Sequence, residues 1–326
     1  MSKIIYLLGA GASYGKRENN ELVRGVPIVE EFVDQLGRVI QTTNDSFIQQ
    51  ELSWLQTICK KYPTVDTYAS ILYKRSNKSY ESNEEYTRLK KAIALFLSLI
   101  QKPETRDERY DLFFAAITQE KAQLPDEVTI LSWNYDSQLE FAYSEYVPSV
   151  QDMNILWKKH LNVYNKTSLL QADHRKFGVV KLNGTALWCD PKENKIWDIY
   201  LNPNIATCST QVLSQSCQFD ISNMVTGLSF SWEKNDTLLE YIRKIAIDTE
   251  VVVVVGYSFP DVNRLIDKHI FGYMPKIKKV YIQDKKPFEV ADNLKFIIDP
   301  AQFKINNITI EPTKYVDKFI IPRELL

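Results

Sequence analysis

The chain lacks an excess of charge of either sign. Its 326 residues include 40 basic and 41 acidic side chains, which leaves a net charge of −1 at pH 7. No long run of lysine and arginine interrupts this balance. Because proteins that wrap a nucleic-acid backbone do so mainly through clustered positive charge, direct nucleic-acid binding is not expected.

Long hydrophobic runs are also missing. A helix that crosses a bilayer needs about 20 consecutive apolar residues, and no stretch approaches that length. The N-terminal stretch KIIYLL lacks a cleavage site of small residues and runs directly into a glycine-rich turn. We interpret it as a buried strand and not as a signal peptide. A cytoplasmic protein without membrane contact is therefore expected.

The cysteines do not form metal-binding pairs. Cys59, Cys189, Cys208 and Cys217 are far apart, and no two of them have CxxC spacing. A zinc ribbon is therefore not expected, nor is any other metal. Each thiol is interpreted as a small packed hydrophobe in a reducing compartment.

What the sequence does contain is a repeated pattern of strand, turn and helix. The run VVVVV at 251–255 is typical of a central parallel strand that is buried on both faces. In a doubly wound sheet, the turns that follow such strands gather at the C-terminal edge, where ligands bind. The sequence therefore predicts an α/β, Rossmann-like doubly wound parallel sheet in a single domain, 1–326. The segments with this pattern are 8–13, 132–136, 182–185 and 255–260.

Two segments interrupt the predicted sheet. Residues 45–125 have broad apolar helical faces and predict a large helical insertion. Residues 148–225 predict a small irregular module with a hairpin, because a polar turn separates two arms that carry Trp188 and Trp197. Pro27 is expected in the first turn of a helix, and 315–320 is expected to form a short edge element.

The turn after the first strand reads GAGAS and comprises Gly9, Ala10, Gly11, Ala12 and Ser13. Its glycines would let the backbone approach a pyrophosphate, which amides of the following turn would bind. The alternative is a tight turn without a ligand. A dehydrogenase would show GxGxxG and an acidic residue at the end of a second strand. Here the third glycine comes one position late and the later region is predicted to be helical, which argues against hydride transfer.

Polar residues also follow other strands. Asn134 can orient a water or hold a ribose hydroxyl, whereas Asp136 either accepts from a carboxamide or caps the next helix. Gly256 and Ser258 offer backbone and hydroxyl contacts to phosphate or ribose. The Gln-Asp pair at 283–284 is expected near the adenosine end of a dinucleotide.

The order of these motifs resembles the NAD-binding domain of the sirtuins. GAGAS, GVP, the Asn-x-Asp strand end, KLNGT and GYS follow one another as GAGxS, GxP, NxD, LHG and GxS do in that family. The chain looks most like divergent bacterial sirtuin-like proteins that hydrolyse NAD in antiphage defence. The resemblance implies that Asn134 and Asn183 are catalytic. It also implies that NAD is held by Gly9, Ala10, Gly11, Ala12, Ser13, Pro27, Asp136, Gly256 and Ser258.

The chain departs from the family at several points. It lacks the paired cysteines of the sirtuin zinc ribbon, and IVE replaces the Asp-Phe-Arg that follows GxP in deacylases. Asn183 replaces the family histidine of LHG, which is the general base. An asparagine cannot accept a proton at neutral pH, although it can hydrogen-bond a ribose. His174 is either a substitute that swings in from a loop or an exposed surface residue.

We therefore expect a NAD hydrolase that cleaves the nicotinamide–ribose bond. A polar pocket can support an oxocarbenium-like transition state without a strong base. The alternative is a NAD-sensing or nucleotide-binding module that has lost turnover, and a deacylase is disfavoured. The resemblance also implies a homo-oligomer, or a separate sensor or ATPase partner, for which the exposed faces of 45–125 are the expected contact.

Overall fold

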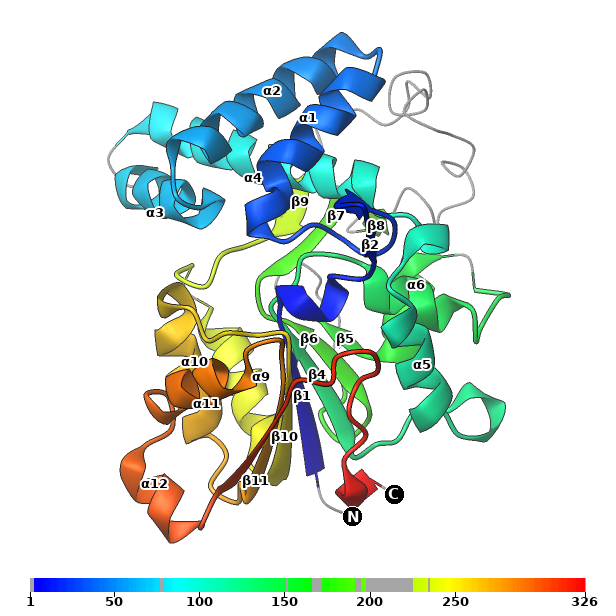
Figure 1. The fold of residues 1–326 in the computed structure, drawn as a ribbon, viewed down its shortest axis with the longest axis vertical. Helices are drawn as coiled ribbons and strands as arrows, with labels where there is room; N and C mark the ends of the chain where they lie inside the picture. The colour runs from blue at the N-terminus through cyan, green and yellow to red at the C-terminus, as the bar shows by residue number, and fades with distance from the viewer. Residues whose placement is uncertain are drawn as a thin grey trace.

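Seven parallel strands form the central sheet of the computed structural model (Figure 1), which confirms the predicted Rossmann-like α/β fold. The structure describes residues 3–76, 79–150, 152–165, 172–190, 195–197, 225–233 and 235–325. The strand order is β12-β11-β10-β1-β4-β6-β5. The bounds are β1 (Lys3–Leu8), β4 (Val128–Ser132), β5 (Val163–Tyr164), β6 (Gly178–Lys181), β10 (Thr249–Val255), β11 (Lys279–Gln283) and β12 (Thr309–Thr313).

The valine-rich strand β10 lies at the centre of the sheet, as predicted. It pairs with β1 on one side and with β11 on the other. All five valines from Val251 to Val255 are at most 2% exposed. Because parallel strands in this position are covered on both faces, the sequence needs no polar alternation there.

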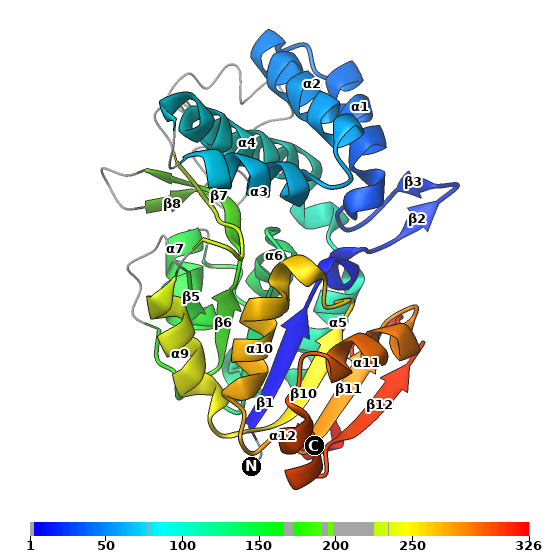
Figure 2. The same cartoon turned by 90° about the vertical axis from the view of Figure 1, so that its left-hand side faces the viewer.

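Helices cover both faces of the sheet (Figures 1 and 2). One face carries the helices on either side of β10 and those that follow β11, and the other carries the helices on either side of β4. This arrangement makes the sheet doubly wound. The first group is α9 (Asp236–Ala246), α10 (Arg264–Gly272) and α11 (Pro287–Lys295), with the short α12 (Pro300–Ile305) after it; the second is α5 (Glu108–Ile117), α6 (Gln138–Ser144), α7 (Met153–Ile155) and the π-helix η5 (Leu156–Leu161).

A separate helical layer lies over the C-terminal edge of the strands (Figure 1). Its core combines buried residues of four helices with residues of two short strands, such as Trp188. The predicted insertion at 45–125 is therefore divided, since α5 covers the sheet and only the earlier helices form this layer. The elements are α1 (Phe32–Thr42), α2 (Ser46–Lys61), α3 (Val65–Ser76), α4 (Tyr80–Ile100), β7 (Gly184–Asp190) and β9 (Val225–Leu228).

The predicted Trp hairpin is present. Strand β7 pairs antiparallel with β8 (Lys195–Trp197), and Trp188 lies opposite Trp197. Strand β9 pairs with the other side of β7. Part of the predicted 148–225 module, including 198–224, lies outside the described residues.

Two local predictions were wrong. Pro27 is not in the first turn of a helix, because α1 begins only at Phe32 after a 3-10 turn, Val29–Glu31. That turn is held by the Glu31 carboxylate, which accepts from the Ile28 amide and pairs with Arg17. A second short hairpin, β2 (Arg17–Glu18) and β3 (Glu21–Leu22), precedes it.

The segment 315–320 is not a strand. Instead, one side chain of the neighbouring strand binds its backbone at three points: Gln283 donates to the carbonyls of Tyr315 and Lys318 and accepts from the amide of Ile320. We call 315–320 the C-terminal strap.

No described helix is long and apolar enough to cross a membrane.

Candidate functional site

The candidate site lies where the sheet changes its direction of winding. Strand β1 has β4 on one side and β10 on the other, and the chain reaches β4 before it crosses over to β10. Loops that leave β1 and β10 therefore diverge, which leaves a crevice at their C-terminal ends. In open α/β sheets, this switch point is where ligands bind.

The glycines of the two loops contact each other. A Cβ added at Gly11 would lie 2.7 Å from the Cα of Gly256, and one added at Gly9 would lie 2.6 Å from the Gly256 carbonyl oxygen. Gly256 itself has a φ of +56°, where a side chain is strained. Close packing between two loops thus explains all three glycines, with or without a ligand.

The same contact uses backbone amides that were expected to face a pyrophosphate. The Gly9 amide donates to the Val255 carbonyl at 3.0 Å, and the Gly11 amide donates to the Gly256 carbonyl at 2.9 Å. Ala10 is exposed at the tip of the loop, and no acceptor among the described residues binds its amide. The donors left for a phosphate are consequently fewer than the motif predicted.

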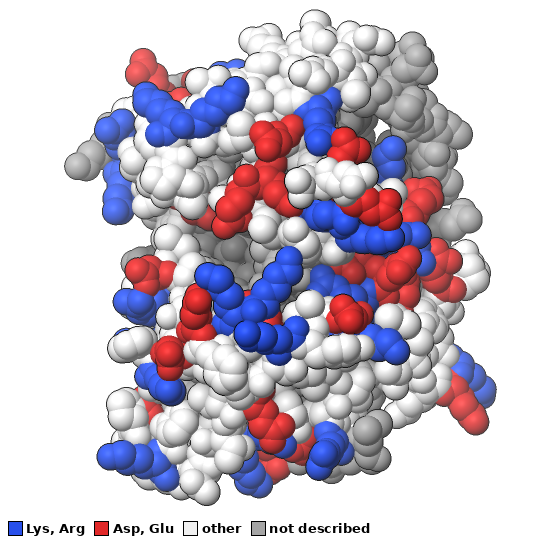
Figure 3. Space-filling view, in the orientation of Figure 1, with Lys and Arg blue, Asp and Glu red and all other residues white. Residues whose placement is uncertain are grey.

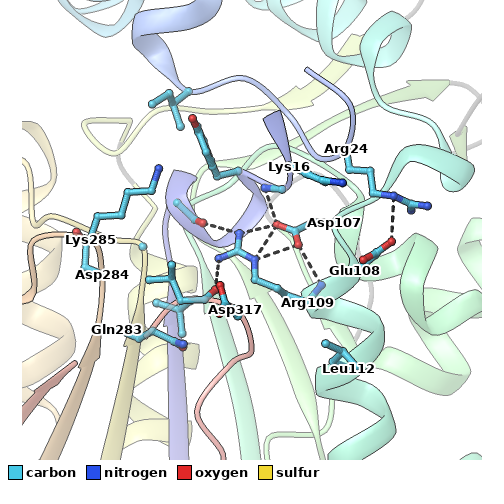
Figure 4. Close-up of a pocket in the computed structure, with 17 residues that line it drawn as sticks. Lys16, Arg24, Asp107, Glu108, Arg109, Leu112, Gln283, Asp284, Lys285 and Asp317 are labelled. Carbon is cyan, nitrogen blue, oxygen red and sulfur yellow. Dashed lines mark hydrogen bonds and ion pairs between the residues drawn. The ribbon is translucent and has the colours of Figure 1, made fainter. Parts of the chain in front are cut away.

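A cavity of about 470 Å³ opens beside this loop contact (Figure 4). This volume is within the range of small-molecule sites, roughly 300–1,000 Å³. Its walls come from the GAGAS loop, the start of α5, the ends of β10 and β11, and the strap. The lining residues are Gly11, Tyr14, Gly15, Lys16, Arg24, Ile28, Asp107, Glu108, Arg109, Leu112, Val255, Gly256, Gln283, Asp284, Lys285, Val316 and Asp317.

Charges in this lining are balanced. Three of the four basic side chains are paired with acids: Lys16 with Glu18, Arg24 with Glu108, and Arg109 with Asp107. The lining holds four acidic side chains as well, Asp107, Glu108, Asp284 and Asp317. Figure 3 shows Lys and Arg side chains gathered between the helical layer and the sheet, with acidic side chains beside them.

Lys285 is the basic side chain of the cavity that pairs with no acid among the described residues. Its ammonium lies 4.1 Å from the centre of the Tyr14 ring, and the Arg17 guanidinium lies at the same distance from that ring. Cation–π contacts of this kind are weak at exposed sites, about 0.5–1 kcal/mol. Lys285 is therefore free to turn towards an anion at the mouth of the cavity.

Asp107 and Arg109 form a clamp on the GAGAS loop that the sequence did not reveal. The Arg109 guanidinium donates to the carbonyls of Gly11 and Ala12, at 2.8 and 3.2 Å. The Asp107 carboxylate pairs with Arg109 at 2.5 Å and accepts from the Gly15 amide at 2.7 Å. The partners are more than 90 residues apart, so the sequence shows no local pattern for this clamp. The one signal in the sequence is Asp107 itself, which is a recognisable helix N-cap before α5.

Asn134 binds the same loop from the end of β4. Its side-chain amide donates to the Gly9 carbonyl at 2.9 Å and to the Ser13 hydroxyl at 3.1 Å. Ser13 is fully buried and bonded to the Tyr110 hydroxyl at 2.9 Å, so its side chain does not face the cavity. Since both N–H groups of Asn134 are engaged, its carbonyl oxygen is the atom left to hold a water or a ribose hydroxyl.

Asp136 lies inside the protein and supports the start of α6. Its carboxylate accepts from the Gln138 amide at 3.1 Å, which is the capping role that was weighed against ligand binding. Burial raises the pKa of the Asp136 carboxyl, and the nearby Lys181 ammonium opposes that shift.

Asn183 follows β6 and lies next to the end of β4. Its side-chain amide donates to the Trp133 carbonyl at 3.3 Å. The side-chain carbonyl oxygen of Asn183 is buried and has no partner among the described residues. An unsatisfied buried acceptor costs about 1–3 kcal/mol, so a ligand or water that donates to it would be favoured.

None of the three histidines lies at this edge of the sheet. His174 precedes β6 and is exposed, so it lies at the opposite end of that strand from Asn183 and cannot act as a base beside it. His160 precedes β5 in the same way, and His269 is in the last turn of α10. The exposed-residue interpretation of His174 is confirmed.

The remaining predicted site residues do not line the cavity. Ser258 borders a different hollow between α10 and α11, where its carbonyl accepts from Asn293. Pro27 and Ala12 are buried. The structure thus places Gly11 and Gly256 on the cavity wall, puts Asn134 in contact with the same loop, and separates Ser258 from them.

A buried carboxyl lies behind the loop of β10. Asp267 is 0% exposed and accepts from the Tyr257 hydroxyl at 2.7 Å. The Tyr257 ring stacks on that of Trp133. Burial raises the pKa of Asp267 to about 7, although the Tyr257 hydroxyl opposes the shift.

Across the described residues, no three His, Cys, Asp or Glu side chains are grouped as they would be around a metal ion. A scan with models of known protein families finds no match for this chain, and a search of curated proteins finds none either.

Proposed function

We propose that this protein binds NAD at the C-terminal edge of its sheet and hydrolyses the bond between nicotinamide and ribose. The observation that carries the proposal is the cavity at the switch point, whose wall contains Gly11 and Gly256 and whose loop is bound by Asn134. Parallel sheets of this type bind nucleotides at that position.

Charge balance favours NAD over more anionic nucleotides. The lining contains four basic and four acidic residues. NAD carries a pyrophosphate and a cationic nicotinamide ring, so its net charge is small. A nucleoside triphosphate is much more negative and is normally held by net positive charge together with a metal ion.

The chemistry that we assign needs no strong base. As nicotinamide leaves, it takes the bonding electron pair and becomes neutral, while positive charge develops on the ribose. Water then adds to the ribose carbon and releases a proton to solvent. The Asn134 carbonyl oxygen would orient that water or a ribose hydroxyl, and the unpartnered Asn183 oxygen would accept from the ribose.

Nicotinamide release from NAD by the purified protein tests this proposal. We expect turnover that Asn134→Ala abolishes, with the melting temperature checked for each variant. Asn306→Ala is a matched control, because Asn306 also donates to a carbonyl, that of Pro275, but lies away from the C-terminal edge. Equal turnover in wild type and Asn134→Ala would refute the role of Asn134.

A second candidate is a NAD-binding sensor without turnover. The observation in its favour is that all three histidines lie away from Asn183. Asn183→His distinguishes the two functions. A large rise in turnover at unchanged affinity would identify a sensor that has lost its base, whereas little change would support a hydrolase that works with asparagine.

Antiphage defence and a switching partner remain part of the proposal through the sirtuin resemblance. The helical layer offers a contact surface, since Phe47 and Tyr80 are 51% and 75% exposed beside a groove between α2 and α4. If this layer mediates homo-oligomer or partner assembly, Phe47→Ser with Tyr80→Ser should change the assembled mass. An unchanged mass would count against this surface.

A further inference from the structure

Lys181 and Glu140 form an ion pair inside the protein. Lys181 is the last residue of β6, and Glu140 lies in the first turn of α6. Their side chains are 2% and 0% exposed, and the ammonium lies 2.7 Å from a carboxylate oxygen. Two charges have therefore been removed from water at the C-terminal edge of the sheet.

The alternation of side chains along β6 explains how the ammonium reaches this position. Val179 packs in the core shared by α5 and α6. Residues two apart on a strand point to the same face, so Lys181 is directed towards the same helices. Its position is thus set by the strand and not by a flexible surface side chain.

Stability does not explain the pair. Removing two ions from water is costly, and apolar residues of similar volume usually serve as well or better. Removing only one partner, by contrast, leaves a buried charge and destabilises strongly. The buried pair of Lys181 and Glu140 at the C-terminal edge of the sheet therefore needs an explanation other than stability.

A second contact of Lys181 supplies that explanation. Its ammonium also donates to the backbone carbonyl of Asp136, at 2.9 Å. Asp136 belongs to the 133–137 turn between β4 and α6, which carries Asn134. Two neighbouring backbone groups of that turn are hydrogen-bonded as well. The Tyr135 carbonyl accepts from the Ala186 amide, and the Ser137 amide donates to the Gln101 side chain.

We propose that Lys181, held in place by Glu140, is a positioning residue that fixes the 133–137 turn and thereby the carbonyl oxygen of Asn134. The inference rests on the proposed NAD hydrolysis for its catalytic consequence. Without the ammonium, the Asp136 carbonyl loses its donor, and the peptide between Asp136 and Ser137 is held only by the bond from the Ser137 amide to Gln101. A displacement of about 1 Å in a group that orients the reactants can lower the rate about 100-fold.

The test is the double variant Lys181→Met with Glu140→Leu, which removes both charges of the pair and keeps apolar volume. The pKa of the buried Asp136 carboxyl then rises further, because Lys181 no longer opposes the effect of burial, and this favours the uncharged form of Asp136. We expect a free energy of unfolding close to that of wild type, faster amide hydrogen exchange at 134–138, and a kcat about 10- to 100-fold lower. The Kd for ADP-ribose should change less than about twofold, because the cavity lining is untouched. Lys276→Met with Asp248→Leu is the control, since that exposed pair lies at the other edge of the sheet.

The outcomes separate this inference from the proposed function. Wild-type kcat and wild-type exchange in a folded double variant would overturn the positioning role. If wild-type protein neither binds nor cleaves NAD, the proposed function fails, and hydrogen exchange alone still decides whether Lys181 fixes the turn. If the apolar variant does not fold, Lys181→Gln with Glu140→Gln replaces it. The glutamine side chain is shorter than lysine and cannot reach the Asp136 carbonyl. We therefore expect the same changes in hydrogen exchange and kcat.

Discussion

Glycine at positions 11 and 256 is set by backbone contact more than by ligand contact. A side chain at either position would collide with the other loop. The GAGAS motif thus has a structural reason that is independent of NAD. The close approach of the two loops also forms one wall of the cavity that we propose for NAD.

Gly256→Ala is expected to destabilise the protein by more than about 2 kcal/mol, because its Cβ would lie 2.3 Å from the Gly11 carbonyl carbon in a strained backbone conformation. Urea unfolding measures this change. Gly272→Ala is the control: a Cβ added there would have nothing within 4 Å, so unfolding should shift by less than about 1 kcal/mol. Equal effects of the two substitutions would contradict the loop contact.

Lys285→Met should weaken ADP-ribose binding about fivefold without changing stability, because one exposed charge contributes about 1 kcal/mol to an anion. Lys285 is the cavity lysine that forms no ion pair with a described residue and lies over the Tyr14 ring. Lys295→Met is the control, since Lys295 pairs with Asp292 on the surface of α11. A calorimetric titration that finds the two variants equal would remove Lys285 from the site.

Among the elements, the C-terminal strap differs from its prediction. It was expected to form an edge element, yet its backbone is bonded to the side chain of Gln283. It lines the cavity through Val316 and Asp317, and the Val316 carbonyl accepts from Arg109. The strap therefore connects β11 with the clamp on the GAGAS loop.

Gln283→Leu should release the strap, because two carbonyls lose their donor and one amide loses its acceptor. We expect faster hydrogen exchange at 316–320 and weaker ADP-ribose binding. Gln302→Leu is a matched control, since Gln302 also donates to two backbone carbonyls, but from α12 to Phe271 and Met274 at the end of α10. Unchanged exchange in the strap would show that Gln283 does not hold it.

Sequence patterns predicted the elements with strong local signals. The valines of β10 and the Trp hairpin are examples, because burial on both faces and a polar turn each leave a local signature. Contacts between distant segments left none. The clamp of Asp107 and Arg109, the strap and the Lys181 contact all depend on the tertiary arrangement. His174 illustrates the same limit, since it is near Asn183 in the sequence but lies at the opposite end of β6.

For the whole molecule, the buried carboxyl of Asp267 predicts how stability varies with pH. An aspartate has a pKa of about 3.9 when unfolded, and burial raises the folded value to about 7. Between these values the folded state binds more protons, so stability falls as pH rises from 4 to 7. Asp66, whose pKa burial raises to about 6, acts in the same direction.

Asp267→Asn should flatten this dependence and make the protein more stable than wild type at pH 8, because no charge then needs to be buried. Chemical unfolding at pH 5 and pH 8 measures the effect. Asp261→Asn, at an exposed residue before the same helix, should leave the wild-type slope unchanged. If the stability of Asp267→Asn still falls as pH rises, another group causes the pH dependence.

We propose that the switch point of the sheet binds the ADP-ribose part of NAD. Calorimetric titration with ADP-ribose, which the proposed reaction does not consume, measures this binding. We expect saturable one-to-one binding that NAD competes for, that ATP competes for poorly, and that Lys285→Met weakens. No binding of either ADP-ribose or NAD by the folded protein would contradict the assignment of this edge as a NAD site.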